Sequence, residues 1–418
     1  MKKKCQLSHI ETQLIHGAYE PEKTTGATTL PLFQSTAFAY QSAEALEAVF
    51  AGREAGFIYS RINNPTLDRF ERRMNALENG LAAISCASGM AAISATVLGL
   101  AGTGDEIVSA NSIFGGTYSL FGHTLTRYGI KTNFVNTTDV DAYKEAINDR
   151  TKLVFVETIG NPKLDVPDIA AIAAITREKG VVLVVDNTVT TPLLLQPGAL
   201  GANIVIHSTS KFINGHGNAI GGIIVDCGNF DWSNKRYAHL DAFYKRFRNF
   251  AFVAMLRNQI CRDIGLCFAP FNAFLMSIGI ESLAVRLERH CSNAVKVAEF
   301  LAGDSRVTEA RYPGLTGHPD HEVAARQFHG RYGGLLTLTL GTKERCFRFI
   351  NGLKFAQNAA NLGDAKTLVI HPASTFCRDL DEQERQAMGV TEDLVRFSIG
   401  LEHIDDIVND IDDSLKQL

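Results

Sequence analysis

Side chains able to do chemistry follow directly after three apolar runs of the sequence. Asp186 closes one run, Lys211 lies shortly after the next run along the chain, and Glu157 closes the preceding one, with Asn161 just beyond it. In open α/β sheets ligands bind beyond the carboxyl ends of the strands, so we expect these side chains at one edge of a sheet. An acid and a lysine placed there could form an ordinary ion pair, so the neighbouring residues must decide whether they belong to a functional site.

Those neighbours favour a site that holds a phosphate. Ser208 and Ser210 flank the lysine, and the turn Ser88-Gly89-Met90 stands between an expected strand and an uncharged helical stretch. A small glycine-containing turn at the start of a helix presents free N–H groups and the positive end of the helix dipole, which suits a phosphate. Pyridoxal phosphate requires this combination: a lysine forms the Schiff base, an acid keeps the pyridine nitrogen protonated, and donors anchor the phosphate.

The elements that must position these residues alternate between short β-branched runs and helical stretches. The runs 153–156 and 181–185 are apolar without alternation, which is typical of strands covered on both faces in a parallel sheet. The sequence predicts a helix over 66–80 that ends at Gly80 and a helix over 167–179 that ends at Gly180, and the second fits a right-handed crossover. A mostly parallel seven-stranded sheet is expected from strands at 83–85, 106–109, 131–135, 153–157, 181–186, 204–207 and 222–225.

The pattern changes after about residue 270. A helical stretch over 272–301 is followed by alternating strands at 335–340 and 394–398, which indicates a smaller α+β domain. We therefore predict an α/β fold with a large sheet domain and a smaller C-terminal α+β domain. The predicted divisions are an N-terminal arm contacting a neighbouring subunit (1–60), a cofactor-binding domain (61–270) and a C-terminal domain (271–418).

Composition and charge exclude several classes of protein. The chain of 418 residues is 45% hydrophobic and 21% charged, with a formal net charge of −4, so it is globular and lacks the charge of a nucleic-acid-binding protein. Residues 79–104 carry no charge, but their serines, threonines and glycines favour a buried helix over a membrane span. The eight cysteines are sparse, and no apolar signal segment follows Lys4, so we expect a cytoplasmic protein without a metal site.

Seven stretches carry a resemblance to a known family. They are YSRINNPT (59–66), SCASGMAAI (85–93), VDNTVTTP (185–192), HSTSKFINGHG (207–217), RLERHCSNA (286–294), HPAS (371–374) and VRFSIGLE (395–402). They cover nearly the whole chain in order. The chain resembles the cysteine and methionine metabolism family of pyridoxal phosphate enzymes, which implies the pyridoxal phosphate transferase fold of type I, the aspartate aminotransferase-like fold.

The resemblance implies a role for each matching residue. Lys211 is the Schiff-base lysine and later shuttles protons, Asp186 pairs with the pyridinium nitrogen, and Arg396 binds the substrate α-carboxylate through a bidentate fork. Tyr59 and Arg61 reach the phosphate of the neighbouring subunit's cofactor, which makes a homodimer the minimum active unit. The other cofactor-binding residues are Ser88, Gly89, Met90, Ser208, Ser210, Thr188, Phe114 and Asn161; the other substrate-binding residues are Asn161, Asn361 and Ser374; catalysis involves Lys211, Phe114 and Tyr59.

Within the family, three stretches are of the O-acetylhomoserine sulfhydrylase type, namely 157–169, 231–244 and 358–375. The lyases and cystathionine γ-synthase tend to have Ser where Asn361 stands. The resemblance therefore implies an O-acetylhomoserine aminocarboxypropyltransferase (EC 2.5.1.49). Such an enzyme replaces the acyloxy group of O-acetyl-L-homoserine by sulfide and forms L-homocysteine in methionine biosynthesis.

One position departs from the family pattern. Where the family usually has a Tyr stacked on the cofactor ring, this chain has Phe114, which can stack but has no hydroxyl. A thiol leaving group benefits from an acid at this place, whereas acetate leaves as a stable anion and needs little help. Phe114 therefore favours an activated ester over cleavage of methionine or cystathionine, although slow turnover would fit it equally.

Other functions stay open as alternatives. They are cystathionine γ-synthase, a methionine or cystathionine γ-lyase, and a catalytically silent protein of the same fold, although the presence of Lys211, Asp186 and Arg396 argues against the last. A nicotinamide dehydrogenase is excluded, because no GxGxxG follows a strand. The sequence leaves undecided the acyl group (acetyl or succinyl), the sulfur donor (sulfide, a small thiol or a protein carrier) and the choice between homodimer and homotetramer.

Overall fold

A seven-stranded sheet forms the centre of the computed structural model, which describes residues 9–18, 21–22 and 24–418. The strand order is β1-β7-β6-β5-β4-β2-β3, and β7 alone runs against the other six. The predicted large, mostly parallel sheet is thereby confirmed. The strands are β1 (Ala82–Cys86), β2 (Glu106–Ala110), β3 (Lys131–Val135), β4 (Thr151–Glu157), β5 (Val182–Asp186), β6 (Ile204–His207) and β7 (Gly222–Asp226).

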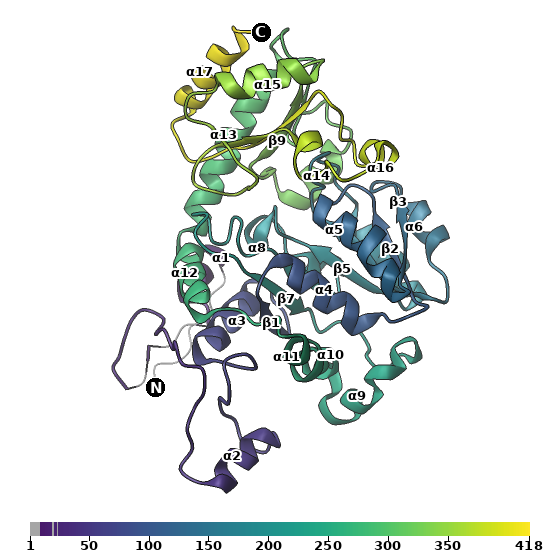
Figure 1. Ribbon diagram of the computed structural model, residues 1–418, viewed down its shortest axis with the longest axis vertical. Helices are drawn as coiled ribbons and strands as arrows, with labels where there is room; N and C mark the ends of the chain where they lie inside the picture. Colours follow the sequence, from purple (N-terminus) through teal and green to yellow (C-terminus); the bar gives the residue numbers. More distant parts are fainter. Residues whose placement is uncertain (1–8, 19–20, 23) are drawn as a thin grey trace.

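Helices cover this sheet (Figure 1), as the apolar strands at its centre require. Every residue of β5 and β6 is buried. The uncharged stretch 79–104 contains β1 and the buried helix α4 (Gly89–Leu100), as predicted. No helix among the described residues is long and apolar enough to cross a membrane.

Two helix ends show how local sequence sets element boundaries. Helix α7 (Ile169–Lys179) ends at Gly180 in the left-handed conformation, at φ 64°, as predicted. Helix α3 (Pro65–Leu77) ends before the predicted Gly80, because Asn79 takes the left-handed conformation instead, at φ 55°. Asparagine tolerates that conformation better than most residues.

A second, five-stranded sheet lies in the C-terminal part of the chain and confirms the smaller α+β unit. Its order is β10-β11-β12-β9-β8, and α13 (Leu283–Ala302), α15 and α17 lie beside it (Figure 1). The elements are β8 (Glu309–Arg311), β9 (Leu335–Thr339), β10 (Gln357–Asn358), β11 (Leu368–Ile370), β12 (Leu394–Ser398), α15 (Lys343–Gly352) and α17 (Ile404–Leu415). These strands and helices enclose their own cluster of buried apolar side chains.

The helical stretch predicted over 272–301 is two helices, so that prediction was wrong in detail. Helix α12 (Pro270–Glu281) and helix α13 (Leu283–Ala302) meet at Ser282, whose φ of −101° and ψ of 4° are not helical. At this break Arg286 donates hydrogen bonds to the carbonyl oxygens of Gly279, at 2.7 Å, and Phe212, at 2.8 Å. The break therefore lets a buried arginine hold the backbone next to Lys211.

The N-terminal part of the chain contains one helix packed on the main core and one segment that projects from it. In α1 (Ile10–His16) the side chain of Leu14 is buried in the main core, whereas the segment around α2 (Ala43–Phe50) projects from the body (Figure 1). Large apolar side chains are exposed along it, at Leu32, Phe33, Phe50 and Tyr59.

The cysteines that the structure describes are all free thiols, at positions 86, 227, 261, 267, 291, 346 and 377. Cys5 and the segment directly after Lys4 lie outside the described residues.

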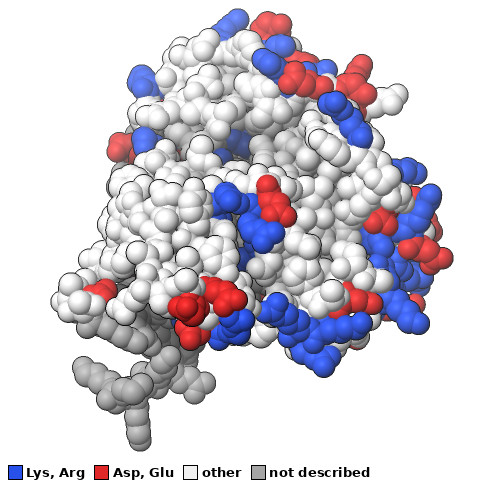
Figure 2. Space-filling view, turned by 60° about the horizontal axis from the view of Figure 1, so that its bottom comes forward, with Lys and Arg blue, Asp and Glu red and all other residues white. Residues whose placement is uncertain are grey.

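Charged side chains of both signs are mixed on the visible surface. Figure 2 shows Lys and Arg beside Asp and Glu along the edges of the molecule, with broad uncharged areas between them. This arrangement agrees with the small net charge of −4.

Candidate active site

The ends of β4, β5 and β6 open into one cavity of about 210 Å³, as the strand-end pattern predicts. Because parallel neighbours place their carboxyl ends at the same edge, residues far apart in sequence meet there. The predicted site residues that line this cavity are Gly89, Met90, Phe114, Asn161, Asp186, Thr188, Ser208, Lys211, Asn361 and Arg396.

Lys211 presents its amine to the cavity. Its Nζ donates a hydrogen bond to Oδ1 of Asn361 at 2.7 Å. Partial burial, together with the charge of Arg396, lowers the pKa of the Lys211 amine to about 8. The unprotonated fraction of this amine near neutral pH is therefore far larger than for an ordinary lysine, and the neutral amine can act as a nucleophile or a base.

Arg396, on β12, is held with its guanidinium facing the same space. Nη1 donates to Oδ1 of Asn161 at 3.0 Å, and Nη2 donates to the backbone oxygen of Asn361 at 2.8 Å. The ring of Phe376 lies 5.0 Å from the guanidinium carbon, a cation–π contact. Burial lowers the pKa of Arg396 to about 10, and its Nε has no hydrogen-bond partner among the described residues. The side chain thus keeps a buried donor for an anionic ligand.

Two carboxyl groups, Asp186 and Glu157, lie side by side because β4 and β5 pair them in register. Burial raises the pKa of both, but the N–H and the hydroxyl of Thr188 donate to Asp186 and oppose that rise. The pKa of Glu157 is raised further by the Asp186 charge, and Glu157 accepts one hydrogen bond, from the backbone N–H of Phe114 at 2.7 Å. Asp186 is therefore the acid of the pair that ionises first.

The turn at the start of α4, which the sequence predicts to hold a phosphate, borders the cavity through Gly89 and Met90. Ser88 caps the helix, because its side chain accepts a hydrogen bond from the N–H of Ala91 at 3.0 Å. The N–H groups of Gly89 and Met90, in the first turn, have no partner within the helix and can bind an anion. A Cβ on Gly89 would lie 2.6 Å from Cβ of Ser208, so only glycine lets these segments approach. An anion cradle, an ionisable acid and an amine therefore surround one cavity, and these residues fit pyridoxal phosphate.

Other predicted residues lie outside the wall of this cavity. The hydroxyl of Ser210 bonds to the backbone of Gly221, and the hydroxyl of Ser374 bonds to Nδ1 of His371 at 2.8 Å. Ser88 is occupied as a helix cap. Tyr59 and Arg61 lie between α2 and α3, with the Arg61 guanidinium 5.6 Å from the Tyr59 ring and its Nη1 donating to the backbone oxygen of Arg262.

The sequence assigned no role to some residues that line the cavity. Glu157 was recognisable as a strand-end acid, but its bond to the Phe114 backbone was not. Phe376, whose ring centroid is 6.1 Å from that of Phe114, gave no sequence signal, because it stands at the edge of a polar surface segment. The remaining apolar lining includes Ile93, Val189, Ala360 and Leu362.

Comparison with known proteins agrees with this geometry. Residues 11–416 match the family described as Cys/Met metabolism PLP-dependent enzyme. The chain is 41% identical to O-acetyl-L-homoserine sulfhydrylase of Leptospira meyeri, covering 98% of this chain and 97% of that protein. It is also 41% identical to homocysteine synthase of Schizosaccharomyces pombe, covering 98% of each.

A solved structure gives the same fold. The crystal structure of a protein assigned as an O-acetylhomoserine (thiol)-lyase from Campylobacter jejuni, which carries N′-pyridoxyl-lysine-5′-monophosphate, superposes with a TM-score of 0.94. That protein is 36% identical to this one, and the match covers 97% of this chain and 99% of the other.

Proposed function

The chain belongs to the Cys/Met metabolism family of PLP-dependent enzymes, and from this we propose that it is an O-acetylhomoserine sulfhydrylase. In this reaction sulfide replaces the acetoxy group at Cγ of O-acetyl-L-homoserine, and L-homocysteine and acetate are formed. Full-length similarity to proteins with that name supports the proposal. The observation that carries it is the 2.7 Å contact between the Lys211 amine and Asn361 in a cavity also lined by Arg396.

The cofactor's place follows from the groups around the cavity. Pyridoxal phosphate, when bound, supplies an electron-accepting ring that stabilises the negative charge left on the amino acid after loss of a proton. We assign Lys211 to the covalent link, Asp186 to the ring nitrogen and the first turn of α4 with Ser208 to the phosphate. Thr188 supports Asp186, and Phe114 provides an aromatic face for the ring.

Lys211 is then the group that moves protons. Its depressed pKa of about 8 lets Nζ take a proton from Cα of the substrate and return it at a later step. The amide oxygen of Asn361 holds Nζ at 2.7 Å and fixes the direction from which the amine approaches. Asn361 therefore acts as a positioning residue for the proton carrier.

Arg396 and Asn161 bind the α-carboxylate of the substrate. The guanidinium is held by Asn161, by the backbone of Asn361 and by the Phe376 ring, so its orientation is set before the substrate arrives. No hydroxyl stands at Phe114 to protonate a leaving thiol, whereas acetate leaves as a stable anion without an acid. This supports an ester substrate over a thioether.

Two further assignments extend the proposal beyond one chain. Tyr59 and Arg61 complete the phosphate site of a second copy, which makes a homodimer the minimum active unit and a homotetramer the expected assembly. The exposed apolar side chains of the N-terminal part, among them Phe33 at 38% and Tyr59 at 40%, support a contact there. We place the enzyme in the cytoplasm, where amino-acid biosynthesis supplies its substrates.

A product assay tests the proposed reaction. The holoenzyme is given O-acetylhomoserine, O-succinylhomoserine, cystathionine or methionine, each with and without sulfide, and homocysteine, keto acid and ammonia are measured. Homocysteine formed from O-acetylhomoserine only when sulfide is present supports the proposal. Keto acid and ammonia without sulfide would indicate a γ-lyase instead. The variant Lys211→Ala is the control for uncatalysed replacement.

A further inference from the structure

The loop Gly160–Val166 carries Asn161 into the active site and is closed by its own backbone. The N–H of Gly160 donates to the oxygen of Asp165, and the N–H of Leu164 donates to the oxygen of Gly160, both at 2.9 Å. A Cβ on Gly160 would lie 2.3 Å from Oγ of Ser112, so the loop also packs closely against the segment after β2. The backbone turn and this contact fix one side of the loop.

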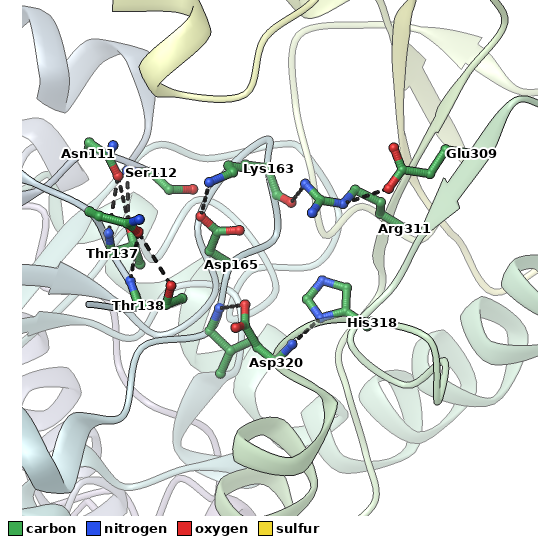
Figure 3. A network of polar contacts seen from close by, with 12 residues as sticks. Asn111, Ser112, Thr137, Thr138, Lys163, Asp165, Glu309, Arg311, His318 and Asp320 are labelled. Atoms are coloured by element: carbon green, nitrogen blue, oxygen red, sulfur yellow. Dashed lines mark hydrogen bonds and ion pairs between the residues drawn. The ribbon is translucent and has the colours of Figure 1, made fainter. Parts of the chain in front are cut away.

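The other side of the loop is held by side chains from the C-terminal part of the chain. Oδ2 of Asp320 accepts a hydrogen bond from the backbone N–H of Val166 at 3.0 Å. Nη1 of Arg311, on β8, donates to the backbone oxygen of Lys163 at 3.4 Å. Figure 3 shows these side chains converging on the loop from the opposite side to Ser112. Residues from both parts of the chain thus hold the loop that presents Asn161.

Charged groups of both signs surround the loop. Lys163 pairs with Asp165 at 2.7 Å, Arg311 pairs with Glu309 at 3.1 Å, and Asp320 adds a third acid (Figure 3). Nδ1 of His318 accepts from the backbone N–H of Asp320 at 3.1 Å, and burial lowers the pKa of this histidine to about 4, so it is neutral. Removing Asp320 from this half-buried set leaves the backbone N–H of Val166 without its acceptor.

We infer that Asp320 is a positioning residue for substrate recognition, because its bond to Val166 holds the loop that places Asn161 3.0 Å from Arg396. This inference rests on the proposed role of Arg396 and Asn161 in binding the substrate carboxylate. Asp320 touches neither substrate nor cofactor in this arrangement. It acts through the backbone of residues 160–166, from a part of the chain 154 residues away.

The test compares two small reagents that attack the lysine-bound cofactor. Aminooxyacetate carries a carboxylate and hydroxylamine does not, so the ratio of their second-order rate constants for oxime formation, followed by absorbance, measures carboxylate recognition. We expect Asp320→Ala to lower this ratio about fivefold, as the loss of one hydrogen bond implies, and to raise KM for O-acetylhomoserine more than it lowers kcat. Asp320→Asn keeps an acceptor oxygen for Val166 and retains the wild-type ratio.

A matched control separates positioning from general destabilisation. Asp304 also lies in the C-terminal part and is paired with Arg306, away from the loop, so Asp304→Ala lowers thermal stability without changing the ratio. An unchanged ratio in Asp320→Ala overturns the inference. A wild-type enzyme with no preference for aminooxyacetate overturns the carboxylate role itself. If Asp320→Ala does not fold, Arg311→Met, which removes the donor to Lys163, must lower the ratio two- to threefold for the inference to stand.

Discussion

The amine of Lys211 and the amide oxygen of Asn361 lie 2.7 Å apart, although 150 residues separate them in the chain. The backbone oxygen of the same asparagine accepts from Arg396 at 2.8 Å. One residue of the C-terminal part therefore contacts both the group assigned to proton transfer and the group assigned to the substrate carboxylate. The distance between the Lys211 amine and the Arg396 guanidinium therefore depends on how the segment around Asn361 packs.

Replacing Asn361 by alanine tests the contact with Lys211. We expect Asn361→Ala to lower kcat about tenfold while the cofactor stays bound, because the amine loses a charge-assisted hydrogen bond that directs it. Exchange of the substrate α-proton for deuterium, followed by NMR, measures the step directly. Asn358→Ala, at an exposed position on β10, is the control and should exchange at the wild-type rate. Equal exchange rates in both variants would contradict a positioning role.

The depressed pKa of Lys211 predicts how the apoenzyme takes up its cofactor. Only the neutral amine attacks the aldehyde, so the rate of uptake rises with pH, and the midpoint lies near the pKa of about 8 instead of 10.5. Arg396→Gln removes a positive charge that contributes to this shift and moves the midpoint to higher pH. Stopped-flow absorbance of the lysine-bound cofactor across pH 6–11 measures both. A wild-type midpoint above pH 10 would exclude the depressed pKa.

Arg396→Lys tests whether geometry or charge alone binds the carboxylate. The substituted ammonium keeps the charge but loses the fork that contacts Asn161 and the flat face that meets Phe376. We expect kcat/KM for O-acetylhomoserine to fall about 10- to 100-fold, with most of the change in KM. Steady-state kinetics checks this. Arg378→Lys, on an exposed side chain, provides the control.

Phe114→Tyr restores the hydroxyl that relatives usually carry. An acid at this position helps a thiol to leave, so the variant should release keto acid from cystathionine or methionine at least about tenfold faster than the wild type. Its rate with O-acetylhomoserine should change little. Keto acid formation measures the gain, with Phe271→Tyr, on the exposed part of α12, as control. No gain in elimination would show that the missing hydroxyl does not set the substrate class.

Glu157 gives a prediction about stability. Burial, together with the charge of Asp186, raises the pKa of Glu157 well above its usual value, which favours the protonated form, and that form resembles glutamine. Glu157→Gln keeps an acceptor for the N–H of Phe114 and should leave the free energy of unfolding within about 1 kcal/mol of the wild type. Glu157→Ala leaves that donor unpaired and should cost about 1–3 kcal/mol. Chemical denaturation of the apoenzymes distinguishes the two variants.

Much of the large sheet could be predicted from local pattern. Strands such as 181–186 read as unbroken apolar runs because both faces are covered, and the side chain that follows each run reaches the ligand edge by simple geometry. For that reason Asp186, Lys211 and Asn161 were predicted to lie together, and they line one cavity. The motif around Lys211, together with Asp186 and the turn at Gly89, also indicates the cofactor from the sequence alone.

The chain by itself determined which chemistry is available, since the residue types, their order after the strands and the helix start at Gly89 are all local features. Only the tertiary structure decided which groups touch. Contacts between segments far apart in sequence set three features of the site. They are the helix break at Ser282, the packing of the Phe376 ring against Arg396, and the hydrogen bond from the N–H of Val166 to Asp320. Local pattern cannot specify such contacts, because their distances follow from the packing of the two sheets and the helices between them.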